Sequence, residues 1–307
     1  MKILSRIVKV LTKVKNMKIK KAFSLIELSI VILIIGILIA GVIQASNLLS
    51  KFRISSANTL TESSPVNGIY GLVLWLETTK KESFDDSVDP SGSANTVENW
   101  YNINPQSYKT VATQSSAGSR AILVDKSPLN YLPALKFNGT SNFYTMSPVL
   151  TSSNPNLTIF AVGVFLQASI RNAIFGQYSL ATQDTNHFFR IAINGGIDYD
   201  EFTPYGNAAH AADGSVVSNV PFILTVVRST NIPKIYKNGE LLKTGAAEIY
   251  SGAAIVSTEI GRRGGTNIAD YFNGYLGEII VFDKALKSEE RSSIESYLSK
   301  KWAIKLK

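Results

Sequence analysis

The chain has 307 residues, of which 45% are hydrophobic and 18% are charged, so its composition excludes an intrinsically disordered chain. The formal net charge of +8 arises at the start: residues 1–22 hold eight Lys and Arg and no acid, while the rest holds 23 Lys and Arg against 23 Asp and Glu. This neutral body argues against a nucleic-acid-binding protein, which needs clustered cations. Cysteine is absent, which excludes disulfides, thiolate catalysis and Cys-ligated metal sites.

An uncharged apolar run follows the basic start. Residues 28–50 carry no charged side chain, and a helix of that length spans roughly 35 Å, enough to cross a bilayer. Because the cations precede this run, we expect a cytoplasmic N-terminus and an exported remainder. The run predicts a transmembrane and assembly helix over 23–54. A cleaved secretory signal fits less well, because its apolar core would be shorter and a small-residue cleavage site would follow.

Glu27 is an unusual residue at the edge of this run. A carboxylate in an apolar segment is costly and is by default a candidate for function. The plainer alternative is a simple signal anchor in which Glu27 is tolerated near the membrane interface.

Residues 20–27, Lys-Lys-Ala-Phe-Ser-Leu-Ile-Glu, resemble the class III leader of type IV prepilins and pseudopilins. In that family a prepilin peptidase/methyltransferase removes the basic leader on the cytoplasmic side and methylates the new N-terminus. The resemblance implies that 1–22 is the leader, that cleavage falls between Ala22 and Phe23, and that Phe23 begins the mature chain. It also implies that Glu27 pairs with the free amine of Phe23 in a neighbouring pilin-like subunit, since a buried carboxylate needs a partner.

Two features depart from the usual pattern of that family. Ala22 stands where Gly usually precedes the cut, which predicts slower cleavage. The leader is also long, and Met17 is an alternative start that would give a short leader ending at Ala22.

Two segments of different composition follow the apolar run. Residues 55–67 are rich in Ser, Thr and Asn with one Pro, which predicts a linker over 55–69. Short apolar runs separated by Asn-Gly and other Gly-rich turns then follow, at 71–76, 132–137, 157–166, 222–228, 234–237 and 276–282. This pattern predicts a mainly β domain over 70–307, an antiparallel two-sheet sandwich or barrel.

A single helix is expected at the C-terminal end, over 288–302. Ser288 is a candidate N-cap, and acids then bases follow in the order that the helix dipole favours. The spacing of three and four residues predicts an inward stripe formed by Ile294, Tyr297, Leu298 and Trp302.

The β domain resembles the concanavalin A-like, laminin-G-like jelly rolls of bacterial surface proteins. The resemblance rests on the order of five motifs, at 72–77, 97–100, 133–139, 235–240 and 274–282, with the closing helix. It implies a jelly roll over 70–307. Such a fold does not specify a function, because its members bind glycans or proteins, hydrolyse glycans, or act as spacers.

Calcium is the metal for which the sequence offers candidate ligands. Laminin-G-like and lectin jelly rolls often bind it through loop oxygens, and Asp85, Asp86 and Asp89 lie in one loop. The competing and favoured interpretation is a solvated acidic loop.

Glycoside hydrolysis would need two carboxylates about 5 Å apart on one strand. The closest run of acids is Asp198, Asp200 and Glu201, which we interpret as a loop between glycines and a proline. Glu278 and Asp283 are five residues apart and are expected on opposite faces of a strand. The sequence therefore predicts no enzyme, with a tethered glycan hydrolase as the least favoured alternative.

Together these features predict a minor pilin or pseudopilin in the bacterial inner membrane, with its N-terminus in the cytoplasm. Its jelly roll would stand in the periplasm or on the surface and bind a glycan or protein ligand, as an adhesin does. The alternative is a membrane-tethered binding module that never polymerises. The expected partners are the peptidase/methyltransferase, other pilin-like subunits and the membrane, with no nucleic acid.

Overall fold

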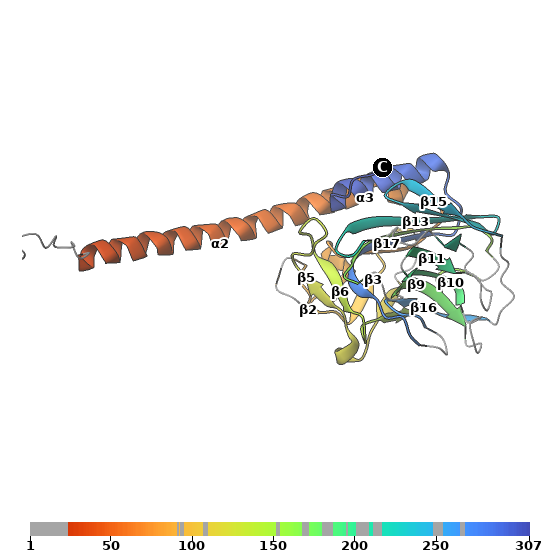
Figure 1. The fold of residues 1–307 in the computed structure, drawn as a ribbon, viewed down its shortest axis with the longest axis horizontal. Coiled ribbons are helices and arrows are strands. Elements are labelled where there is room, and N and C mark those ends of the chain that lie inside the picture. Colours follow the sequence, from red (N-terminus) through yellow and green to blue (C-terminus); the bar gives the residue numbers. More distant parts are fainter. Residues whose placement is uncertain are drawn as a thin grey trace, which may run out of the picture. The chain divides into compact units, whose positions relative to one another are not determined.

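The computed structural model describes residues 24–307, apart from 91, 93–94, 107–109, 152–153, 168–171, 180–186, 195, 201–208, 211–216, 248–253 and 265–267. The chain divides into two units, Met1–Leu49 and Ser50–Lys307. We call the second unit the head. Each is described by itself below, and Figure 1 gives the order of the elements.

A long helix, α2 (Leu25–Glu62), begins in the first unit and ends in the second. The sequence predicted a helix ending near residue 54 and a linker over 55–69, and the end of the helix was placed wrongly. In the Ser- and Thr-rich turns, hydroxyls donate to carbonyls four residues earlier, as Thr61 does to Ala57 (3.0 Å), an arrangement that is compatible with a helix. Burial of Ile54 and Ala57 holds the same stretch against the head. We call residues 50–62 the stem segment.

The rest of the head is a sandwich of two antiparallel sheets, which lie face to face in Figure 1. The first sheet has the order β15-β14-β13-β8-β17-β6-β5-β2, with β1 also paired to β17. Its strands are β1 (Leu72–Glu77), β2 (Asn95–Thr96), β5 (Ile122–Val124), β6 (Ala134–Asn138), β8 (Leu157–Phe165), β13 (Pro221–Ser229), β14 (Ile232–Lys237), β15 (Glu240–Thr244) and β17 (Asn273–Phe282). Short 3-10 turns, η1 (Pro65–Gly68), η2 (Lys81–Ser83) and η3 (Ala117–Ser119), punctuate the chain.

The second sheet has the order β12-β11-β10-β9-β16-β7-β4-β3. Its strands are β3 (Asn99–Tyr101), β4 (Val111–Thr113), β7 (Tyr144–Met146), β9 (Asn172–Ser179), β10 (His187–Asn194), β11 (Gly196–Asp200), β12 (Ala209–His210) and β16 (Ile255–Ile260). The antiparallel sandwich that the sequence predicted is confirmed.

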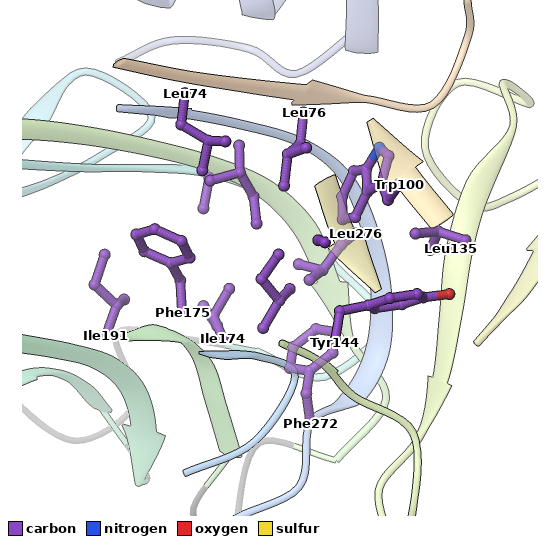
Figure 2. Packing of buried hydrophobic residues seen from close by; sticks show 14 of the residues in the cluster. Leu74, Leu76, Trp100, Leu135, Tyr144, Ile174, Phe175, Ile191, Phe272 and Leu276 are labelled. Atoms are coloured by element: carbon purple, nitrogen blue, oxygen red, sulfur yellow. The ribbon is translucent and has the colours of Figure 1, made fainter. Parts of the chain in front are cut away.

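The central strands of the first sheet are buried on both faces, which explains why they are mostly apolar instead of alternating between apolar and polar residues. In β8, Ile159 and Ala161 belong to the core between the sheets, whereas Phe160 and Val162 belong to a second core on the outer face. The alternation follows the two-residue period of a strand. Figure 2 shows the inner core, with side chains of β1 pointing toward those of β9 and β10.

The second core is closed by the C-terminal helix α3 (Ser288–Trp302) and by the stem segment. Figure 1 shows α3 on the outer side of the sheet that contains β13 and β17. The predicted inward stripe is confirmed, because Ile294, Tyr297, Leu298 and Trp302 are all buried. Gly277 lets this helix approach closely, since a Cβ there would lie 2.6 Å from the Trp302 ring.

The start of α3 differs from the expectation. Ser288 is the first helical residue rather than its cap, and the residue before it is Lys287. The Glu290 carboxylate accepts a hydrogen bond from the backbone N–H of Lys287 (2.9 Å) and so satisfies the helix end from inside the first turn.

Candidate assembly helix and buried anchor of the head

The first described turn of α2 contains Glu27. Its carboxylate Oε2 accepts a hydrogen bond from the backbone N–H of Ser24 at 2.8 Å. The positive end of the helix dipole also stabilises a negative charge at this position. Glu27 is exposed, so this contact leaves its carboxylate open to a further donor. Ala22 and Phe23, the predicted cleavage and methylation residues, lie outside the described residues.

The apolar part of α2 is exposed among the described residues of its own unit, 24–49. An 18-residue window has a mean hydropathy of 2.9, and none of it is buried. Side chains such as Ile32, Leu33 and Ile37 are at least 60% exposed. A surface of this size and polarity fits either a lipid bilayer or the packed helices of other subunits.

The charged anchor of the head is a buried lysine, Lys301, at the end of α3. Its ammonium nitrogen lies 2.9 Å from a carboxylate oxygen of Glu77 and 3.1 Å from one of Glu278. All three side chains are fully buried. The two glutamates are cross-strand partners, because Glu77 ends β1 and faces Glu278 of β17 in the register.

Both carboxylates are saturated with donors. Glu278 accepts hydrogen bonds from the indole N–H groups of Trp75 (2.7 Å) and Trp302 (2.8 Å) and from the Tyr297 hydroxyl (2.8 Å). Glu77 accepts from the hydroxyl and the backbone N–H of Thr79, among other groups. Burial of an ion pair is tolerated only when the remaining lone pairs are satisfied in this way.

The stem segment supplies a ligand to the same ammonium group. Lys301 donates to the Thr61 hydroxyl at 2.8 Å, and the Asn58 amide oxygen accepts from the Thr79 hydroxyl at 3.1 Å. The end of α2 is therefore bonded to α3 and to Thr79, two residues after β1, and it is also packed in the second core.

The charges of this cluster depend on one another. Burial opposes the charged forms of both partners, but attraction between them and their hydrogen bonds outweigh it. The pKa of Glu77 is consequently held below its usual value, and the pKa of Lys301 is raised. Burial and the nearby charge of Glu278 raise the pKa of the Tyr297 hydroxyl well above its usual value.

This cluster was missed at the sequence level. The sequence pattern sets Glu278 beside Asp283, which follows β17, and explains the basic residues at the end of α3 by the helix dipole alone. The available signal was a pair of glutamates inside otherwise apolar strands, together with a lysine next to the last inward residue of the helix.

The calcium candidates are placed as follows. The Asp85 carboxylate accepts hydrogen bonds from the Asn99 amide (3.1 Å) and the Tyr101 hydroxyl (2.8 Å), and the Asp86 carbonyl accepts from the Lys81 ammonium. Asp89 follows in the same loop. Within the described part of the chain, no three His, Asp or Glu side chains are grouped to hold a metal ion. Calcium at Asp85, Asp86 and Asp89 therefore stays a prediction without support from this geometry.

The acids near residue 200 are not in a loop as we expected. Asp198 and Asp200 belong to β11, which pairs with β10. Tertiary pairing overrode the local turn signal of the flanking glycines and proline. Glu201 lies outside the described residues.

A pocket of ≈ 340 Å³ opens beside the stem segment and is lined in part by Glu62, Lys80, Glu82 and Asn102. Its charged groups satisfy each other, since the Lys80 ammonium lies 3.0 Å from carboxylate oxygens of both Glu62 and Glu82. Asn102 likewise bonds to the backbone of β1. Because Glu62, Lys80, Glu82 and Asn102 already have partners within the chain, these groups do not indicate a ligand site.

Comparisons with known proteins address the two ends of the chain separately. The model of the prokaryotic N-terminal methylation motif matches residues 17–43. Comparison with curated protein sequences yields no match.

Among solved structures, Trypanosoma rangeli sialidase is 16% identical, with a TM-score of 0.50 over 76% of this chain and 33% of the sialidase. The same sialidase in complex with 2,3-difluoro-KDN is 14% identical, with a TM-score of 0.51 over 82% of this chain and 38% of that one. The CBM40 domain of Ruminococcus gnavus IT-sialidase is 16% identical, with a TM-score of 0.40 over 45% of this chain and 82% of that one, too distant to support an inference.

The chain thus spans about a third of the length of the T. rangeli sialidase, and the likeness extends to the fold alone. The family model confirms the prepilin-like motif, and the solved structures confirm the sandwich. The chain carries a prokaryotic N-terminal methylation motif on a membrane-length apolar helix, followed by a sialidase-like β-sandwich.

Proposed function

We propose that this protein is a minor type IV pilin-like subunit. It is cleaved before Phe23, anchored in the bacterial inner membrane by α2, and incorporated into a filament that presents the head outside the membrane. The observation that carries the proposal is the methylation motif on a helix whose apolar stretch is exposed and whose first turn contains Glu27.

Assembly follows from the physical chemistry of that helix. Its apolar side chains leave the bilayer only if other apolar helices replace the lipid. Glu27 then needs a cationic partner, because an unpaired carboxylate among apolar helices is costly. The methylated amine of a neighbouring Phe23 supplies that charge and sets the axial register of the two helices.

The head is a ligand-binding unit in this proposal. It is larger than a repeating subunit needs, which favours a minor position such as the filament tip. An adhesive role, with a glycan or a protein surface as ligand, fits the sandwich fold by analogy only.

The buried pair Glu77 and Glu278 does not favour glycan hydrolysis. Glu77 and Glu278 face each other across two strands, as the acid and nucleophile of a glycosidase would. Their side chains are fully buried, and Lys301 neutralises them, so no substrate reaches them. We assign this pair a structural role.

The experiment that tests assembly is the substitution Glu27→Gln, with Glu62→Gln as its matched control at the other end of α2. Glutamine keeps the size and the hydrogen bond to Ser24 but removes the charge. We expect the amount recovered in sheared filaments to fall at least about tenfold, because the partner amine is left unpaired. Membrane insertion should be unchanged.

Equal recovery of Glu27→Gln and of the unaltered chain in sheared filaments would contradict this role. If neither protein is ever recovered in sheared filaments, the tethered module that does not polymerise is the correct alternative.

A further inference from the structure

The turn at residues 127–132 contains an exposed tyrosine, Tyr131, with a left-handed backbone conformation. The turn is closed by the Ser127 backbone N–H and hydroxyl, which both donate to the Leu132 carbonyl (3.1 and 2.7 Å). The Asn130 amide fixes it to the end of α3 by donating to the Lys301 carbonyl (2.9 Å). The turn is therefore a rigid part of the head.

Tyr131, at the tip of this turn, is 61% exposed. Its φ of 54°, following Asn130 with a φ of 55°, lies in the left-handed region, where a bulky residue is strained. Glycine would relieve that strain, and packing does not explain the aromatic ring, which faces outward. A strained and exposed aromatic residue on a rigid turn suggests a binding role.

The partner of Tyr131 within the head is a cation. The Arg53 guanidinium lies over its ring, 4.9 Å from the ring centroid. Lys51 and Phe52 are also exposed on the same turn of the stem segment. These residues follow directly on Ser50, the last residue of the uncharged run, so Arg53 lies about 5 Å along the helix from its end.

We propose that Lys51, Phe52, Arg53 and Tyr131 form a docking surface for the headgroups of anionic phospholipids. We call these four residues the juxtamembrane patch. The proposal rests on the membrane anchoring of α2 and does not require a filament.

The chemistry of the patch matches that of a bilayer interface. Tyrosine rings and basic side chains concentrate where the hydrocarbon ends, the rings among the headgroups and the cations near the phosphates. The patch contains two cations, Lys51 and Arg53, and no acidic residue, so its side chains carry a net positive charge. The sequence position of the patch, directly after the apolar run, favours lipid over a second copy of the chain.

The test uses the full chain in vesicles and a single fluorescent label. Because the chain has no cysteine, Lys126→Cys gives one labelling site beside the turn. Quenching by headgroup-nitroxide lipid is compared between pure phosphatidylcholine and a mixture with phosphatidylglycerol. We expect stronger quenching with the anionic lipid, and a loss of about fivefold in the docked-to-undocked ratio on Arg53→Gln, the contribution of one cation near a charged surface.

Tyr131→Ser should weaken the quenching as well, whereas Lys243→Gln, which removes an exposed cation on β15, should not. Extraction with carbonate reports anchoring separately, so a failed anchor is distinguished from a failed patch. Quenching that is equal in both lipids and unchanged by Arg53→Gln would overturn the proposal. So would quenching that follows the protein-to-lipid ratio instead of the anionic lipid, since a second copy would then cover the patch.

Discussion

Lys301 illustrates how a single residue can define the architecture of the head. Its ammonium group joins β1 through Glu77, β17 through Glu278 and the stem segment through Thr61. A fully buried lysine is unfavourable by itself, so the arrangement is stable only while all of its partners are in place. If any one partner is removed, the desolvation penalty of the remaining buried groups is no longer compensated, and the free energy of unfolding falls.

The substitution Lys301→Met tests this dependence. It leaves two buried carboxylates without a cation, so the free energy of unfolding should fall by about 3–5 kcal/mol. Urea unfolding in detergent, followed by tryptophan fluorescence, measures it directly, because Trp75, Trp100 and Trp302 are all buried in the head. The neighbouring Lys300 is exposed, and Lys300→Met should change the value by less than about 0.5 kcal/mol.

The dependence of stability on pH follows from the same charges. The pKa of Glu77 lies below 4.5 in the folded head, so its contribution is present above that pH and is lost as the pH falls further. The pKa values of Lys301 and Tyr297 are raised, so their contributions are present at neutral pH and are lost at alkaline pH, above about 10. Urea unfolding across pH should show a plateau that falls at both ends.

In the Lys301→Met variant, we expect the free energy of unfolding to rise on the acid side of the profile, where it falls in the unaltered chain. Without the lysine, burial dominates and raises the pKa of the Glu77 carboxyl, so its protonation then stabilises the folded head as the pH falls. An acid limb that is the same in the variant and in the unaltered chain would contradict the assignment of Lys301 as the counter-ion of Glu77.

Among the elements, the stem segment is one whose secondary structure could not be predicted from the local sequence. Serine and threonine favour loops because their side chains compete for the backbone, and this composition predicted a linker. Tertiary burial of Ile54 and Ala57 outweighed that preference. By contrast, the bounds of α3 and the approximate positions of β1, β6, β8, β13, β14 and β17 were predictable, because their apolar patterns are a local property. The long strands of the second sheet, β9, β10 and β16, were not predicted.

The buried anchor could not be predicted for a different reason. Lys301 and Glu77 are 224 residues apart in the chain, and their contact depends on the pairing of β1 with β17. A single sequence contains the charges but not that register. The assembly motif at 17–43 lies at the other extreme, since it is a contiguous pattern that the sequence displays in full.

Docking of the stem segment can be tested by Ala57→Asp. Ala57 is 3% exposed within the second core, so a carboxylate there is buried without a partner and should release the segment from the head. Hydrogen exchange of the backbone amides in 54–62 should become at least about tenfold faster. Ser56 is exposed on the same helix, and Ser56→Asp should leave exchange unchanged. Equal exchange in both variants would mean that packing does not hold the segment.

The whole molecule consists of two parts with different physical chemistry. The apolar helix is stable only in lipid or among other helices, whereas the head folds around two cores of its own. The continuity of α2 into the stem segment makes the link between them helical up to Glu62 rather than an unstructured linker.

The central claim is that the chain is processed as a prepilin and enters a filament. Mass spectrometry of the N-terminal peptide, in the cell envelope and in the sheared surface fraction, tests it most directly. We predict a mature chain that begins at methylated Phe23 in the sheared fraction. An intact leader, found only in the membrane, would contradict the claim and identify the protein as a tethered module.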